Sequence, residues 1–233
     1  MTTSAITTTN PAADLLAEFG GHDAASDVAL MIGINRDKAS EAPFSQYLGD
    51  KDSVALLDGR GRPQKAFEPV TLTGIDIARE VGEFKIDKLN LFLTSSAGTT
   101  VMITSILPNA ASQGWFAQSV LGGLLGLLEE GLISQPFCLE AYKGNRGNRP
   151  VFGTIKTHSG YNGQKYSSQR FYDDCRENSN DRSEITRLCT EAVEDLKAAI
   201  RIEPALVLQE QDFTHLPSSR DLINDDIASL QTD

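Results

Sequence analysis

The sequence predicts an α+β fold that consists mainly of β-strands, and three observations support this prediction. Short apolar runs bounded by turn residues are typical of strands, and one run alternates apolar and polar residues as a half-buried strand does. Two longer segments carry apolar residues at helical spacing. The chain has 233 residues, of which 40% are hydrophobic and 23% charged, so it fits one medium-sized domain with tails or two small domains.

The N-terminal part is expected to contain two strands. Residues 1–10 are rich in Thr and are expected to be disordered, and Pro11–Phe19 is expected to form a short helix. The apolar run Val28–Ile34 predicts a first strand, and Val54–Leu57 predicts a second. Residues 35–51 are polar and contain turn residues, so we expect a loop between the two strands.

The central part predicts three strands, a helix and two further strands. The expected strands are Val70–Ala78, Leu89–Thr94, Thr100–Leu107, Phe137–Tyr142 and Pro150–Lys156. The small residues of Ser95–Thr99 separate the second and third of these strands, which is the clearest hairpin signal in the chain.

The expected central helix, Ser112–Glu130, has the length and the apolar period of an α-helix. Three glycines, Gly122, Gly123 and Gly126, lower its helix propensity and would let a strand or sheet approach closely. Its apolar run covers about 14 residues, whereas a membrane span needs about 20. We therefore expect a buried helix that closes the end of a sheet or barrel.

The C-terminal part predicts one more helix and a tail. Ser183–Ile202 has apolar residues at helical spacing, and Ser183 is its candidate N-cap. Residues 209–233 are polar and acidic and are expected to form a flexible tail. The predicted organisation is thus a single globular domain at 11–202, whose central core lies at about 70–156, with a disordered N-terminus and an acidic tail.

A basic island stands out against the acidic background of the chain. The net charge is −11, yet no Asp or Glu occurs between Ala141 and Arg170. Lys and Arg can pair with phosphates, and Tyr and Phe can stack on bases, which is what a surface for a single-stranded nucleic acid requires. The candidate binding residues are Tyr142, Lys143, Arg146, Arg149, Phe152, Lys156, Tyr161, Lys165 and Tyr166. The alternative is that Phe152 belongs to the core and that the other residues lie on an exposed hairpin without a binding role.

The order of three strands, a helix and two strands resembles that of OB-fold single-stranded DNA-binding proteins of the phage or plasmid replication type. This resemblance covers roughly residues 70–156. It implies a five-stranded Greek-key barrel that binds oligonucleotides on its last hairpin and on the face of strands 2 and 3. The chain departs from the family pattern in its extra 65 N-terminal residues, its second helix and a tail without an aromatic tip.

These features favour a protein that binds single-stranded nucleic acid, expected to be DNA, with little sequence preference. The alternative is a protein–protein adaptor or assembly subunit in which one of the two helices packs on a partner. No nucleotide-binding loop, HExxH or CxxC motif occurs, so we expect no enzyme, cofactor or metal. No signal peptide or membrane span is evident, so we expect a cytoplasmic protein. The sequence is compatible with both a monomer and a homo-oligomer.

Overall fold

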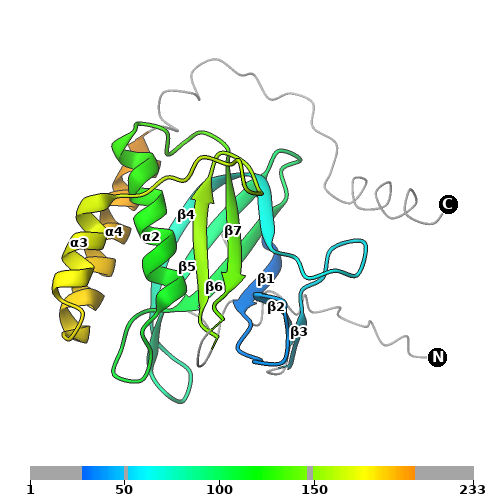
Figure 1. Cartoon of the computed structure of the whole chain (residues 1–233), viewed down its shortest axis with the longest axis horizontal. Helices are drawn as coiled ribbons and strands as arrows, with labels where there is room; N and C mark the ends of the chain where they lie inside the picture. Colours follow the sequence, from blue (N-terminus) through cyan, green and yellow to red (C-terminus); the bar gives the residue numbers. More distant parts are fainter. Residues whose placement is uncertain (1–27, 50–51, 146–148, 203–233) are drawn as a thin grey trace, which may run out of the picture. The chain divides into compact units, whose positions relative to one another are not determined.

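The computed structural model describes residues 28–49, 52–145 and 149–202 (Figure 1). The chain divides into the units Met1–Arg201 and Ile202–Asp233, and apart from Ile202 the described residues belong to the first. The described strands are β1 (Val28–Ile34), β2 (Phe44–Gly49), β3 (Asp52–Ala55), β4 (Ala66–Val81), β5 (Ile86–Ser95), β6 (Thr100–Ile106), β7 (Phe137–Lys143) and β8 (Val151–Lys156). The described helices are α2 (Trp115–Glu129), α3 (Gln169–Glu177) and α4 (Arg182–Ile202). The disordered N-terminus, the helix Pro11–Phe19 and the acidic tail that the sequence predicts lie outside the described residues.

The strands form one mixed sheet in the order β3-β2-β1-β6-β5-β4-β7-β8. β1 runs parallel to β6, with Ile32 beside Ile103, and every other neighbouring pair is antiparallel. The α+β class is therefore confirmed.

The described strands do not form the expected five-stranded barrel, because their sheet is open. The five expected core strands correspond to β4–β8 and lie in the order β6-β5-β4-β7-β8. Closing them would require β6 to meet β8. Instead, β1 pairs with the outer edge of β6, and on β8 the Gly153 N–H donates to the Ser119 hydroxyl of α2 at 2.9 Å.

Local patterns located most elements but missed two. β1 has the predicted bounds, whereas β4 extends the predicted strand at both ends. The sequence predicts a loop where β2 lies, because the polar residues Ser45 and Gln46 hide a strand that pairs with β1. It also misses α3, which is polar except for the face that buries Phe171 and Cys175.

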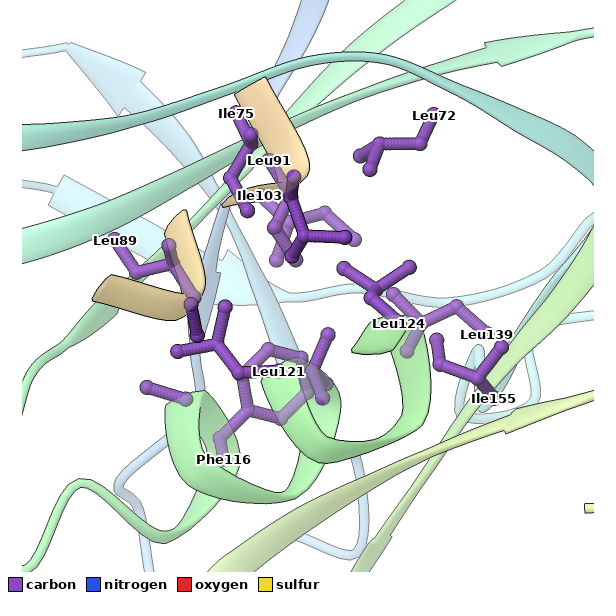
Figure 2. Packing of buried hydrophobic residues seen from close by; sticks show 14 of the residues in the cluster. Leu72, Ile75, Leu89, Leu91, Ile103, Phe116, Leu121, Leu124, Leu139 and Ile155 are labelled. Carbon is purple, nitrogen blue, oxygen red and sulfur yellow. The ribbon is translucent and has the colours of Figure 1, made fainter. Parts of the chain in front are cut away.

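The main core lies between one face of the sheet and the helices. Figure 2 shows Leu121 and Leu124 of α2 packed toward side chains of the sheet such as Leu91 and Ile103. The expected close approach at a glycine of α2 is confirmed, because a Cβ on Gly123 would stand 2.6 Å from the Ile155 side chain. Gly153 of β8 makes the reciprocal approach, since its Cβ would stand 2.2 Å from Val120.

The apolar face of α4 completes this core. The buried residues on that face are Ile185, Cys189, Ala192, Val193 and Leu196. The N-cap of α4 is Asp181 rather than the expected Ser183, because the Asp181 carboxylate accepts the backbone N–H groups of Ser183 and Glu184 at 3.0 and 3.1 Å. No helix among the described residues is both long and apolar enough to cross a membrane.

The opposite face of the sheet carries a smaller cluster and a polar row. Met31, Phe92 and Met102 pack together there. A row of polar residues and one glycine lies two residues along the strands from this cluster. From β2 through β1 and β6 to β5, the row consists of Ser45, Gly33, Thr104 and Asn90. Since alternate residues of a strand face the same side, this row shares the face of Met102 and Phe92.

Candidate nucleic-acid interface

Three aromatic rings form a continuous strip over β7, β8 and the start of α2. Tyr142 and Phe152 are cross-strand partners, and their rings stack with centroids 5.5 Å apart and planes at 25°. Phe152 in turn contacts Trp115, with centroids 5.8 Å apart. Tyr142 and Trp115 keep 51% and 43% of their surface exposed. The strip therefore presents ring faces and edges to solvent at both ends.

The position of Trp115 depends on the glycine that precedes α2. Gly114 is the N-cap and adopts a left-handed conformation with φ 59°. A Cβ at this position would stand 2.6 Å from the backbone nitrogen of Pro108. Glycine is therefore required for the chain to turn into α2 and bring Trp115 to the edge of β8.

Two of the predicted cations hold a distant loop against the β7–β8 hairpin. Lys143 donates from Nζ to the carbonyl oxygens of Asp37 and Ser40 at 2.6 and 2.9 Å. Arg149 donates to the Lys38 carbonyl oxygen at 3.0 Å and pairs with the Glu41 carboxylate at 2.9 Å. Burial lowers the pKa of Lys143, and the nearby Arg149 charge lowers it further. These contacts fix the β1–β2 loop beside the aromatic strip.

The β1–β2 loop is itself held in one shape by side-chain bonds. The Asn35 carboxamide accepts the Asp37 N–H at 2.9 Å and donates to the Ser40 hydroxyl at 3.1 Å. The Asp37 carboxylate accepts the Ala39 N–H at 2.9 Å. The loop therefore presents Arg36 and Lys38 from a defined backbone.

A groove of about 540 Å³ runs between this loop and the start of α2. Arg36, Lys38 and Arg149 line it together with Trp115 and Pro150. None of the described residues that line the groove is an Asp or a Glu. A positively charged groove that begins at an exposed ring thus lies on a chain whose net charge is −11.

The remaining predicted residues that the structure describes lie at or beyond the far end of β8, away from the ring strip. Lys156 is only 5% exposed and pairs with the Glu140 carboxylate at 2.6 Å. Tyr161 and Lys165 are exposed in the loop that follows β8, whereas Tyr166 is half-buried and packs against the main core. Arg146 lies outside the described residues.

Sequence reasoning missed three members of this surface: Trp115, Arg36 and Lys38. The sequence pattern places Trp115 on the apolar face of the predicted helix. It places the two cations in a segment that is predicted to be a polar loop without a function. The available signal was the pair of cations in NRDK directly after a strand, together with an aromatic residue directly after Gly114.

The described residues contain no group of three or more His, Cys, Asp or Glu that could hold a metal ion. The three cysteines are free and buried, as expected for Cys138 and Cys189. Burial raises the pKa of Cys138 to about 12 and that of Cys175 to about 11. Both thiols are therefore protonated at neutral pH, when they are poor nucleophiles.

Comparisons of the chain with protein-family models, with curated proteins and with solved structures find no match. The function is therefore inferred from the geometry of the site.

Proposed function

We propose that this chain binds single-stranded nucleic acid, with DNA as the expected ligand and little preference for sequence. The observation that carries the proposal is the exposed strip Tyr142–Phe152–Trp115 beside a groove that is lined by three cations and no carboxylate. Bases stack on the rings, and phosphates lie along the cations. Stacking is sequence-tolerant because every base has a π-face.

The proposal assigns three roles to the residues of this surface. Tyr142, Phe152 and Trp115 contact bases, and Arg36 and Lys38 contact phosphates. Lys143 and Arg149 are positioning residues. The Lys143 ammonium group donates to two carbonyl oxygens of the β1–β2 loop, and the Arg149 guanidinium donates to the Lys38 carbonyl oxygen and pairs with Glu41. Lys156 is left out, because it is buried and paired with Glu140.

The proposed way of binding, through cations and rings on a β-hairpin, is similar to that of OB-fold single-stranded DNA-binding proteins. The proposal also includes a cytoplasmic location. The alternative, an adaptor in which α2 or α4 packs on a partner, is less favoured. The apolar faces of α2 and α4 are both buried in the main core, so neither offers that face to a partner.

The test measures binding of a fluorescent dT oligomer by polarisation at two salt concentrations. Trp115→Ala and Tyr142→Ala should each weaken binding by about 1–3 kcal/mol, roughly 5- to 150-fold in Kd, because each removes one stacking ring. The double variant Arg36→Ala/Lys38→Ala should make the slope of log K against log salt shallower by about 1.4, because each phosphate contact on a single strand contributes about 0.7.

The matched control is Arg60→Ala/Arg79→Ala, which removes two exposed cations that do not line the groove. This variant should leave the affinity and the salt slope close to those of the parent. Unchanged binding by both ring variants would contradict the proposal, as would equal effects of the two double variants.

A further inference from the structure

A second pocket, of about 630 Å³, lies on the sheet face opposite the helices. Residues of β1, β2, β3 and β6 line one part of it, and the turn between β4 and β5 lines the other. Pockets of about 300–1,000 Å³ are typical of small-molecule sites. The two pockets share Asn35 and Arg36, so the second adjoins the groove at the end of β1.

The floor of this pocket contains a buried hydroxyl group that no group of the described residues satisfies. Thr104 lines the pocket, is only 2% exposed, and has no partner for Oγ1 within the described part of the chain. Ser45, which is 8% exposed, lies two strands away on the same row and also lines the pocket. Buried polar atoms in native proteins nearly always have a partner, so an unpaired one in a pocket wall points to a ligand.

Tyr47 adds a third hydroxyl group to the same end of the pocket. Its ring lies over Gly33, where a Cβ would stand 2.6 Å from the Tyr47 hydroxyl oxygen. Burial raises the pKa of Tyr47, and the positive charge of Arg36 only partly opposes this rise. The phenol is therefore protonated at neutral pH and can donate a hydrogen bond to an anion.

The charges around this polar end also favour an anion. Arg36 is exposed and lines the pocket, and no ion pair joins it to another described residue. Lys88 also lines the pocket, but it lies toward the apolar end, where it is the cross-strand partner of Ile106. Asp37 is the carboxylate in the described lining, and it already accepts the Ala39 N–H.

The other end of the pocket is apolar and carries an exposed ring. Val81, Ile86 and Ile106 line it, and Phe84 projects from the β4–β5 turn with 84% of its surface exposed. A Phe side chain that packs so little against its own protein is available to stack on a flat ligand ring.

We propose that this pocket binds a nucleotide-sized organic phosphate, in which a flat ring contacts Phe84 and the phosphate accepts hydrogen bonds from Thr104, Tyr47 and Arg36. The same chemistry has two sources, a free mononucleotide and the terminal nucleotide of a strand that lies in the adjoining groove. Only the second source rests on the proposed function.

The test is isothermal titration of the full chain with dTMP, and with thymidine and inorganic phosphate as separate halves. Thr104→Val removes one hydroxyl group at constant shape, and Phe84→Ala removes the exposed ring; each should weaken dTMP binding at least fivefold. Neither should lower the melting temperature, because Thr104 Oγ1 has no partner to lose among the described residues and Phe84 is almost unpacked.

Two matched controls separate ligand contacts from general effects of the substitutions. Thr94 lies on the same sheet face outside the pocket, where its hydroxyl already bonds those of Thr73 and Thr100. Tyr161 is another highly exposed ring, and it does not line the pocket. Thr94→Val and Tyr161→Ala should leave dTMP affinity unchanged.

Oligomers with and without a 5′-phosphate distinguish the two sources. If the phosphorylated oligomer binds more tightly and Thr104→Val removes this difference, the pocket holds the end of a strand. If the two oligomers bind equally well and the chain also binds dTMP, the pocket holds a free nucleotide. The pocket proposal is overturned if neither dTMP nor the 5′-phosphate is bound, or if binding is indifferent to both pocket variants. Trp115→Ala provides the separation from the proposed function, because it should weaken oligomer binding while dTMP affinity stays unchanged.

Discussion

At the scale of single residues, polar contacts join segments that the sequence keeps far apart. Glu68 of β4 accepts hydrogen bonds from the backbone N–H and the hydroxyl group of Ser159, in the loop after β8. These bonds are the main reason that the pKa of Glu68 lies below its ordinary value of 4.5. The ionised carboxylate therefore helps to hold the loop over the end of the hairpin.

The lowered pKa of Glu68 predicts a pH-dependent contribution to stability. A carboxyl group whose pKa is lower in the folded state stabilises the fold above its unfolded pKa, and this contribution is lost as pH falls through the folded pKa. The parent should therefore be more stable than Glu68→Gln at pH 6, and the difference should shrink toward zero as the pH falls below about 4.5. Urea unfolding over a series of pH values measures this difference.

Glu80→Gln, on the same strand, is the matched control. Glu80 is exposed, and its carboxylate has no hydrogen bond or ion pair with another described residue. Its difference from the parent should stay small at every pH. A Glu68→Gln difference that is constant between pH 6 and pH 3 would show that the Ser159 contact does not depend on the carboxylate charge.

At the scale of elements, the contact between α2 and β8 positions the aromatic strip. Gly153 allows the strand to meet Val120 and Phe116 of the helix, and its N–H bonds the Ser119 hydroxyl. Trp115 begins the same helix and reaches Phe152, the neighbour of Gly153. The site geometry therefore depends on how closely this helix and this strand approach each other.

Gly153→Ala should destabilise the fold by about 1–3 kcal/mol, because the added methyl group overpacks the contact between α2 and β8. Gly59→Ala is the matched control, since no described atom apart from Gly59 and its two chain neighbours lies within 4 Å of the position of its Cβ. It should change stability by less than about 0.5 kcal/mol. Urea midpoints of the two variants provide the comparison. Equal midpoints would mean that the helix can shift without cost.

At the scale of the whole molecule, charge acts in opposite directions on the fold and on the proposed binding. The chain has 32 acidic and 21 basic residues, so like charges repel within the folded state. The groove, by contrast, has cations and no carboxylate among its described lining residues. Salt screens both interactions, with a Debye length of about 10 Å at 0.1 M.

Raising NaCl from about 0.05 M to about 0.5 M should therefore raise the melting temperature while it weakens oligonucleotide binding. Thermal unfolding and polarisation titrations at matched salt concentrations test the two signs. A melting temperature that falls together with affinity would mean that salt weakens binding by loosening the fold.

The sequence could predict those parts of the fold and site that depend on neighbours along the chain. The apolar run of β1, the hairpin β5–β6 and the apolar period of α2 and α4 each appear within a short window. The sequence also predicts the β7–β8 hairpin, whereas its register, which pairs Tyr142 with Phe152, comes from the structure. Local patterns alone do not reveal β2 or α3, because polar residues mask a strand or helix that is stabilised by its partners.

The sequence by itself determined the α+β class, the basic and aromatic character of the β7–β8 hairpin, and the buried helix beside it. Only the tertiary structure decided that β1 lies parallel to β6, that Lys143 and Arg149 bind a loop more than 100 residues away, and that Trp115 completes the strip of rings. The reason is physical. Local propensity and periodicity act over a few residues, whereas the sheet order and the cation contacts are set by which distant surfaces bury each other best.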